Sequence, residues 1–292
     1  MTTSDQTEAR CFAGLPQWQH PAWEDSLHCI SNHAHPLARY ASYFNSVEGN
    51  TTFYGLPGHK SLKHWDQMVT ESFRFCFKFP QTISHQAELR HCDKELASFI
   101  EAMTLLQGKI GLLCLQLPAS FSIRQLDILA AFLKKLPADF HYGIEVRNPD
   151  FFHKDDAERS FNRLLIDHQI NRISFDTRAL FALPQQDPVS LDAQAKKPQL
   201  PVHVIATGQR PMLRFITPLE WEAGLPWLQP WIKKTAVWLD EGRSPFLFFH
   251  TPDNNQSPQL AEYFARELNK IRPGSLSLPE WPQPNLNQES LF

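Results

Sequence analysis

The feature that most constrains the fold is a series of eight short apolar runs, separated by longer segments with helical periodicity. Alternation of this kind predicts parallel strands joined by crossover helices. Eight such units are the number that closes a (β/α)₈ barrel of the TIM type, and 292 residues are enough for one barrel. The predicted strands are Cys11–Leu15, Ser46–Gly49, Phe73–Phe79, Ile110–Gln116, His141–Arg147, Arg172–Asp176, Met212–Ile216 and Phe246–His250.

Two of the intervening segments show a clear helical pattern. Between Asp93 and Gln107, apolar side chains recur at spacings of three and four, which predicts a helix with one face on the barrel. The segment Ile123–Leu136 repeats this pattern after Ser122, a residue type that caps helices, and Pro137 follows its end. We therefore expect both segments to cover the strands from outside.

The remaining segments define the expected limits of the domain. Residues 1–10 are polar and are expected to be a flexible N-terminus, and residues 11–271 form the barrel. Leu183–Thr207 carries four prolines and two adjacent lysines, which indicates an irregular excursion before strand seven and a candidate lid. Residues 272–292 carry four prolines and few periodic apolar residues, so an extended C-terminal tail is expected there.

Composition excludes several classes of protein. Lys and Arg total 28 against 31 Asp and Glu, so the overall charge does not indicate direct binding of nucleic acid. No apolar run reaches membrane-spanning length and the first residues lack the core of a signal peptide, so we expect a cytoplasmic protein with no membrane partner. The five cysteines contain no C-x-x-C pair and are expected to be reduced core thiols.

Polar residues near the carboxyl ends of the predicted strands are the candidates for a site, because barrels of this type build their sites there. Glu48 interrupts an apolar strand, and Glu145 and Arg147 share one face of another by two-residue alternation. We expect acid–base residues at Glu48, Glu145 and Asp176. We expect residues that bind a small polar or anionic substrate, containing phosphate or a sugar, at Asn50, Tyr54, Lys78, His85, Gln116, Arg147 and Arg214.

Two alternatives remain open for these residues. Glu145 can simply pair with Lys78 or Arg147 in the barrel interior, as buried ion pairs do in many barrels. In a metal-assisted hydrolase, a divalent metal would be held by Glu48, Glu145, Asp176 and His250. No cofactor is indicated otherwise, since the sequence has no G-x-G-x-x-G after a strand, no phosphate loop, no H-E-x-x-H and no G-x-S-x-G.

Five runs together resemble the YecE-like family, also called domain of unknown function 72: Tyr43–Tyr54, Phe73–Phe75 with Lys78, Ile83–His85, Leu115–Pro118 and Glu145–Arg147. The resemblance extends from Phe12 to Phe264 and implies a TIM-type barrel, but it implies no activity. It points to the candidate residues given above and to Thr52. Gly14–Trp18 and Ser290–Phe292 are most similar to the YecE branch of this family.

This chain departs from many family members at two strand ends. Ile216-Thr217 stands where many members have His-Gly, and His250-Thr251 stands where they have a pair of asparagines. A ligand inferred from other members therefore need not transfer to this chain.

The last five residues, Gln288 to Phe292, resemble the short peptides with which bacterial proteins bind the DNA polymerase sliding clamp. In such a peptide Gln288 would bind at the edge of an apolar pocket, and Leu291 and Phe292 would fill the pocket. This favours a second function, a non-catalytic adaptor tethered to the clamp. The alternative is that Phe292 folds back onto the barrel.

Overall fold

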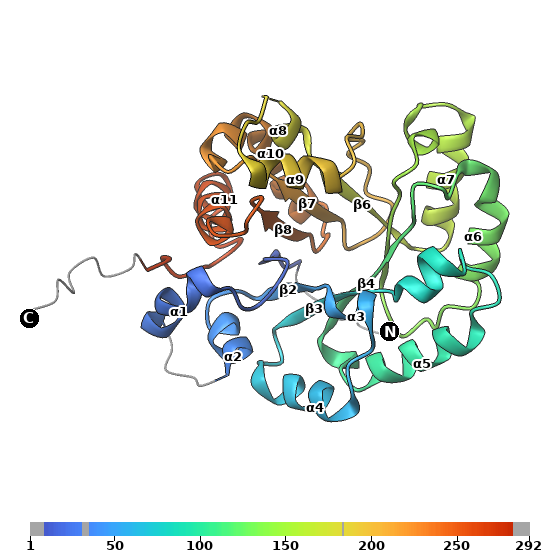
Figure 1. Cartoon of the computed structure of the whole chain (residues 1–292), viewed down its shortest axis with the longest axis horizontal. Coiled ribbons are helices and arrows are strands. Elements are labelled where there is room, and N and C mark those ends of the chain that lie inside the picture. Colours follow the sequence, from blue (N-terminus) through green and yellow to red (C-terminus); the bar gives the residue numbers. More distant parts are fainter. Residues whose placement is uncertain (1–8, 31–34, 183, 283–292) are drawn as a thin grey trace, which may run out of the picture.

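The structure is a computed structural model that describes residues 9–30, 35–182 and 184–282. Its centre is a sheet of eight parallel strands in the order β1-β8-β7-β6-β5-β4-β3-β2, with helices ranged around it (Figure 1). This is the predicted (β/α)₈ barrel. The strands are β1 Phe12–Gly14, β2 Ser46–Gly49, β3 Arg74–Lys78, β4 Ile110–Gln116, β5 Tyr142–Glu145, β6 Asn171–Asp176, β7 Met212–Ile216 and β8 Phe246–His250.

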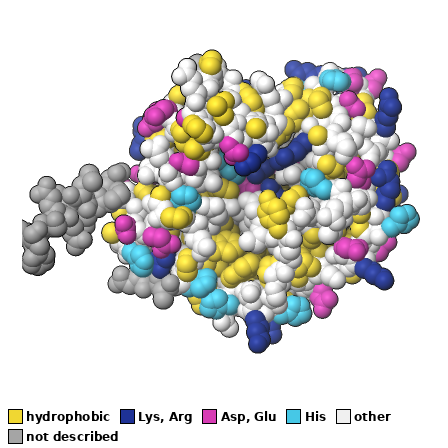
Figure 2. Space-filling model, viewed as in Figure 1, with side chains coloured by type: hydrophobic (Ala, Val, Ile, Leu, Met, Phe, Trp, Pro, Cys, Tyr) yellow, Lys and Arg dark blue, Asp and Glu magenta, His cyan; other side chains and the backbone are white. Residues whose placement is uncertain are grey.

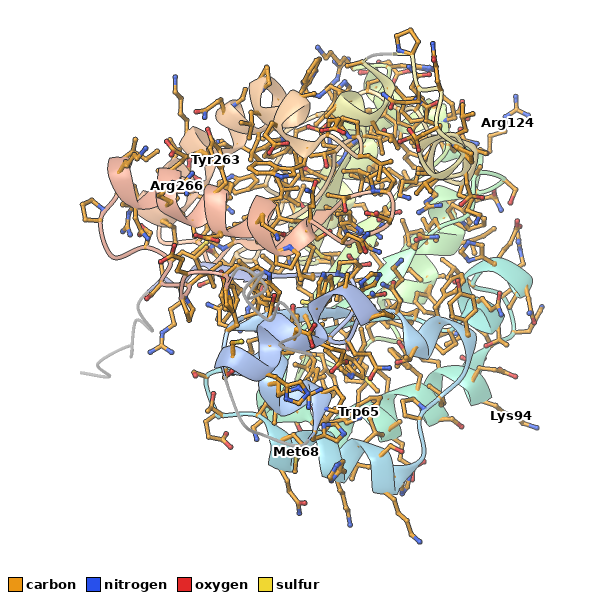
Figure 3. The ribbon with its side chains drawn as sticks, turned by 60° about the vertical axis from the view of Figure 1, so that its left-hand side comes forward. Trp65, Met68, Lys94, Arg124, Tyr263 and Arg266 are labelled. Atoms are coloured by element: carbon orange, nitrogen blue, oxygen red, sulfur yellow. The ribbon has the colours of Figure 1, made fainter. Side chains whose placement is uncertain are left out.

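All eight predicted strands are therefore present. Four of them, β2, β4, β7 and β8, have the predicted bounds, and the other four differ by one or two residues at their ends. The longer helices lie on the outside of the barrel. In Figure 3, Trp65 and Met68 on α4 and Tyr263 and Arg266 on α11 mark two separate places on this outer ring. The helices are α1 Glu24–Ile30, α2 Pro36–Ala41, α3 Thr51–Tyr54, α4 His59–Met68, α5 Asp93–Thr104, α6 Leu126–Leu133, α7 Asp156–Asp167, α8 Arg178–Phe181, α9 Pro188–Lys196, α10 Leu225–Asp240 and α11 Ser257–Ile271.

The predicted helices are confirmed with shorter bounds, as α5 and as a 3₁₀ turn that continues into α6. The excursion before β7 is only partly irregular, because it contains the nine-residue helix α9. The side chain of Asp187 accepts a hydrogen bond from Ser190 N at 2.7 Å, and Pro188 occupies the first turn. An aspartate cap followed by proline is a strong helix start, which the expectation of an irregular segment overlooked.

The barrel closes between β1 and β2 through side chains as well as backbone. The Tyr40 hydroxyl accepts a hydrogen bond from Leu15 N and donates one to Ser46 O, both at 2.8 Å. The Asn45 side-chain amide accepts a hydrogen bond from Ala13 N of β1 at 2.8 Å and donates one to Cys11 O, just before β1, at 2.9 Å. The chains approach closely here, since a Cβ at Gly14 would lie 2.0 Å from the Ser46 oxygen, and only glycine fits.

The interior of the barrel has an apolar layer, since successive residues of a strand point to opposite faces of the sheet. Cys114 Sγ of β4 lies 3.5 Å from Met212 Sδ of β7, a strand on the opposite side of the barrel, so both side chains point inward. Phe12 stacks on Phe246 with ring centroids 4.5 Å apart. The buried members of this layer are Phe12, Cys76, Leu112, Cys114, Ile173, Met212, Phe246 and Phe248.

The packed part of the chain continues beyond residue 271, the expected limit of the barrel. Trp281 is only 3% exposed, and its ring centroid lies 4.9 Å from that of Tyr43. The Ser26 hydroxyl donates a hydrogen bond to Pro282 O at 2.9 Å. The predicted clamp-binding residues Gln288, Leu291 and Phe292 lie outside the described residues. In the part of the chain that the structure describes, no helix is long and apolar enough to cross a membrane.

Candidate functional site

The inward-facing side chains become polar two residues beyond the apolar layer, toward the carboxyl ends of the strands. On β3, β4, β7 and β8 the step of two residues leads from a sulfur or aromatic side chain to a charged, amide or imidazole side chain. We call these residues the polar layer: Glu48, Lys78, Gln116, Glu145, Arg214 and His250.

Arg214 is the centre of the polar layer. Its Nε donates to Glu48 Oε2 at 2.8 Å and its Nη1 donates to Glu145 Oε2 at 2.7 Å. The guanidinium also lies over the Phe175 ring, 4.6 Å from the centroid. Burial alone would lower the pKa of Arg214, but the two carboxylates raise it above its ordinary value. Arg214 is thus a permanent cation that joins β2, β5 and β7.

The two carboxylates are held in the ionised form. Burial would raise the pKa of Glu145, but Arg214 and Arg147 lower it to about 2. The pKa of Glu48 is likewise far below its ordinary value, because Arg214 and Lys78 outweigh the effect of burial. Neither carboxyl group therefore carries a proton to donate at neutral pH.

Lys78 and Arg147 form the more open side of the network. Gln116 Oε1 accepts a hydrogen bond from Lys78 Nζ at 3.2 Å and from Arg147 Nη2 at 3.0 Å. Arg147 Nε also donates to Glu145 Oε1 at 2.8 Å. The exposed fractions of the side chains are 12% for Lys78 and 21% for Arg147, against 1% for Glu48 and 2% for Glu145. Solvent therefore reaches the cations before it reaches the carboxylates.

Two histidines and the lysine have pKa values that are lowered by burial. Burial and the neighbouring Arg214 lower the pKa of Lys78, and burial lowers that of His250 to about 4. His250 Nε2 lies 3.4 Å from Glu48 Oε2. The pKa of His85 is lowered by burial and then by Arg147 and Lys78, which favours its neutral form, and its ring packs edge-on against Phe53 with centroids 5.1 Å apart.

Lys197 is a cation near the site that sequence reasoning missed. It follows α9, and burial lowers its pKa, with Arg214 the next largest cause and Arg147 a smaller one. The excursion before β7 therefore brings the charge of Lys197 within electrostatic range of Arg214 and Arg147. The adjacent lysines of this segment were visible in the sequence, but their placement depends on the path of a long connection.

Asp176 does not join the polar layer. Its neighbour Phe175 contacts Arg214, so by alternation along β6 Asp176 points out of the barrel. Its carboxylate accepts hydrogen bonds from Trp231 Nε1 of α10 at 2.7 Å and from Arg178 Nη2 at 2.7 Å. The structure therefore separates Asp176 from Glu48 and Glu145. Through its hydrogen bond with Trp231, Asp176 instead holds α10 against the barrel.

A cleft of about 510 Å³ opens beside the polar layer and contains three of the predicted residues, Glu48, Asn50 and Tyr54. Asn50 Nδ2 donates to Pro16 O at 2.9 Å, and Tyr54 is 78% exposed. Thr52 is buried, and its hydroxyl donates to Lys78 O at 2.6 Å, which fixes the end of β3. The cleft is lined by Pro16, Gln17, Trp18, Gln19, Glu48, Gly49, Asn50, Thr51, Tyr54 and Asn254.

A larger open groove of about 660 Å³ lies on the outer surface between α6 and α7. Its charged side chains pair with one another, as Arg159 does with Asp156 and Arg163 with Asp167. Both arginines of this groove are paired, so it offers no uncompensated positive charge for an anion, and we place the candidate site at the mouth of the barrel.

The charges at the mouth do not balance. Three cations, Lys78, Arg147 and Arg214, form ion pairs with two carboxylates, Glu48 and Glu145. Figure 2 shows Lys and Arg side chains gathered near the centre of the molecule in this view, beside a hollow. An excess of positive charge favours a negatively charged ligand.

The donor set fits a metal ion poorly. Arg214 lies between the two carboxylates and bonds to both, and Asp176 is on the other face of the sheet. Within residues 9–30, 35–182 and 184–282, no group of three or more His, Cys, Asp or Glu side chains is placed to hold a metal.

Comparison with known proteins gives one family. A family model described as "Protein of unknown function DUF72" matches residues 12–285. The chain is 42% identical to the UPF0759 protein YecE of Escherichia coli K12 over 281 residues, which cover 96% of this chain and 99% of that protein.

Two solved structures of DUF72 family proteins have a similar fold. The one from Enterococcus faecalis V583 is 19% identical, with a TM-score of 0.61, and the match covers 90% of this chain and 98% of that one. The one from Thermotoga maritima MSB8 is 18% identical, with the same TM-score and the same coverage. These two likenesses support the fold alone.

Proposed function

The chain belongs to the family described as Protein of unknown function DUF72, and we propose that it binds a small anionic ligand at the mouth of its barrel and acts on it by acid–base chemistry. The observation that carries the proposal is the excess of cations over carboxylates in the polar layer and its surroundings. Phosphate is the simplest ligand of this class.

The cations are arranged in two tiers. Arg214 donates to both Glu48 and Glu145 and its side chain is only 8% exposed, so it organises the site rather than receiving the ligand. Lys78 and Arg147 each keep donor capacity beyond the bonds described above, and both are partly exposed. Charge-assisted hydrogen bonds from such donors are the usual way in which proteins hold phosphate.

The best candidate for proton transfer is Lys78. Glu48 and Glu145 were the expected acid–base residues, but their low pKa values make them weak bases that serve to position the cations. The lowered pKa of Lys78 brings its ammonium closer to neutral pH, where it can donate a proton to a ligand oxygen and take it back.

The binding part of the proposal is tested by thermal unfolding with inorganic phosphate. Phosphate at 100 times its dissociation constant should stabilise the wild-type protein by about 2.7 kcal/mol. Lys78→Met and Arg147→Met should remove most of this gain. Lys94→Met and Arg124→Met are matched controls, since both side chains are exposed and extend away from the barrel (Figure 3). Equal stabilisation of all four variants would contradict the proposal.

The acid–base part is tested by the protons taken up on binding. A phosphate beside Lys78 favours the ammonium form, so binding above neutral pH should draw a proton into the site. Calorimetric titrations in two buffers with different ionisation enthalpies measure this uptake. Lys78→Met should abolish it, whereas an unchanged uptake would assign the proton to another group.

A further inference from the structure

The cleft beside the polar layer differs in chemistry from the cation cluster. Among the described residues that line it there is no Lys or Arg, and the single charged side chain is Glu48. Four amide side chains and two aromatic side chains make up most of its sides: Gln17, Gln19, Asn50, Asn254, Trp18 and Tyr54. Its volume of about 510 Å³ lies within the range of small-molecule sites.

The two aromatic residues offer one fixed ring and one accessible ring. Trp18 packs edge-on against Trp65 with ring centroids 5.0 Å apart, and Trp65 in turn stacks on Phe77 of β3 at 6.0 Å. Trp18 is thus held in place by the barrel wall. Tyr54 ends α3 and leaves 78% of its surface exposed, which is unusual for a residue with so large an apolar ring.

One buried oxygen atom at the cleft lacks a hydrogen-bond donor. Asn254 Oδ1 has no hydrogen-bond partner in the part of the chain that the structure describes. An unsatisfied buried acceptor is destabilising, so a ligand hydroxyl that reached this atom would relieve the cost. Glu48 Oε1, by contrast, already forms an ion pair with Lys78 Nζ at 3.5 Å.

Glu48 connects the cleft to the anion site. Its Oε2 accepts from Arg214, its Oε1 faces Lys78, and the residue also lines the cleft. Glu48 is shared by the two sites, so a ligand whose anionic group contacts Lys78 and whose next atoms enter the cleft would occupy both. In the cleft those atoms meet aromatic faces, amides that both donate and accept, and the unpartnered Oδ1 of Asn254.

We propose that this cleft binds the sugar ring of a sugar phosphate, an inference that rests on the anion site proposed above. A sugar ring presents a face of C–H groups, which suits the rings of Trp18 and Tyr54, and an edge of hydroxyl groups, which suits Gln17, Gln19 and Asn254. The hydroxyl donors also fit the unpartnered oxygen of Asn254. The substrate class of the mouth is then a phosphorylated monosaccharide.

The test compares three probes by calorimetry: inorganic phosphate, a hexose 6-phosphate and a nucleoside 5′-monophosphate. The hexose phosphate should bind the wild-type protein at least about tenfold more tightly than phosphate, because its ring adds contacts in the cleft. A tenfold difference in affinity corresponds to about 1.4 kcal/mol. Tyr54→Ala and Gln19→Ala should bring the two affinities together and leave phosphate binding unchanged. Tyr263→Ala, on α11 of the outer ring, is the matched control and should preserve the difference (Figure 3).

The outcomes separate this inference from the proposal on which it rests. If phosphate itself fails to bind, the anion site is wrong. If phosphate binds and the hexose phosphate binds no more tightly, or if Tyr54→Ala and Gln19→Ala leave its affinity unchanged, only the sugar subsite is wrong. Tighter binding of the nucleotide than of the hexose phosphate would overturn the sugar assignment in favour of a nucleobase.

Discussion

Replacing Arg214 by Met should strongly destabilise the protein at neutral pH. The change removes two short charge-assisted hydrogen bonds, of 2.8 and 2.7 Å. The buried carboxylates of Glu48 and Glu145 then lose the cation that they share. Each such bond contributes about 1.5–3 kcal/mol, and breaking a buried ion pair typically costs 3–5 kcal/mol. We therefore expect a loss of about 4 kcal/mol in the free energy of unfolding, measured by urea denaturation at pH 7.

Two further variants make this prediction specific to the buried network. The triple variant Glu48→Gln, Glu145→Gln, Arg214→Met also removes the two buried carboxylate charges. It should therefore recover part of the lost free energy of unfolding. Arg159→Met breaks an ion pair whose side chains are 68% and 96% exposed, so its cost should be close to zero. If Arg214→Met costs no more than Arg159→Met, the account of the polar layer as a coupled ionic network is refuted.

Three further predictions concern His250, Asp176 and Trp281. Burial lowers the folded-state pKa of His250 from 6.5 to about 4, so its neutral form contributes fully to the free energy of unfolding above pH 6.5, and this contribution is lost as the pH falls toward 4. Urea denaturation over this range should show a loss of up to about 3 kcal/mol in the wild-type protein that is absent in His250→Asn. Identical pH profiles of the two proteins would contradict this. Asp176→Asn should lower the free energy of unfolding by about 1–3 kcal/mol because Arg178 and Trp231 lose their ionised acceptor, while phosphate affinity stays unchanged in calorimetry; a lost affinity would return Asp176 to the site. Trp281→Ala should cost about 3–5 kcal/mol in the same denaturation assay because it empties a buried contact with Tyr43, and a negligible cost would show that residues 272–282 do not belong to the folded unit.

The sequence was sufficient for the barrel because its signals are local. Each strand is a short run of apolar residues in which every second side chain faces the interior, and these runs are separated by segments long enough for a helix. The same two-residue period puts Glu48, Lys78 and Glu145 two residues after other inward-facing positions of their strands, and therefore on the inward face. Their convergence at the mouth followed from the parallel direction of the strands.

Asp176 shows why the period alone is not sufficient. On β6 one face carries Ile173 and Phe175 and the other carries Arg172 and Asp176. The sequence alone therefore does not decide which face of β6 points into the barrel. The choice is made by tertiary contacts, since Arg172 pairs with Glu158 of α7 on the outside and Asp176 pairs with Trp231 of α10. Those contacts join residues that are 14 and 55 positions apart.

Lys197 was missed for a different reason. It follows α9 in a long connection, and no periodic pattern relates it to the strands that it meets. Its approach to Arg214 depends on how the excursion before β7 folds back over the barrel. The cleft beside Glu48 was hidden for the same reason, because Gln17, Trp18 and Asn254 reach it from loops after β1 and β8.

The central claim is that the mouth of the barrel binds an anion, and the most direct measurement is a crystal structure of the wild-type protein grown with tungstate, a heavy analogue of phosphate and sulfate. The account predicts an anomalous peak within hydrogen-bonding distance of Lys78 Nζ and the Arg147 guanidinium, and no such peak in Lys78→Met crystals. An empty mouth at saturating tungstate, with the anion bound in the groove between α6 and α7 or elsewhere on the surface, would contradict it.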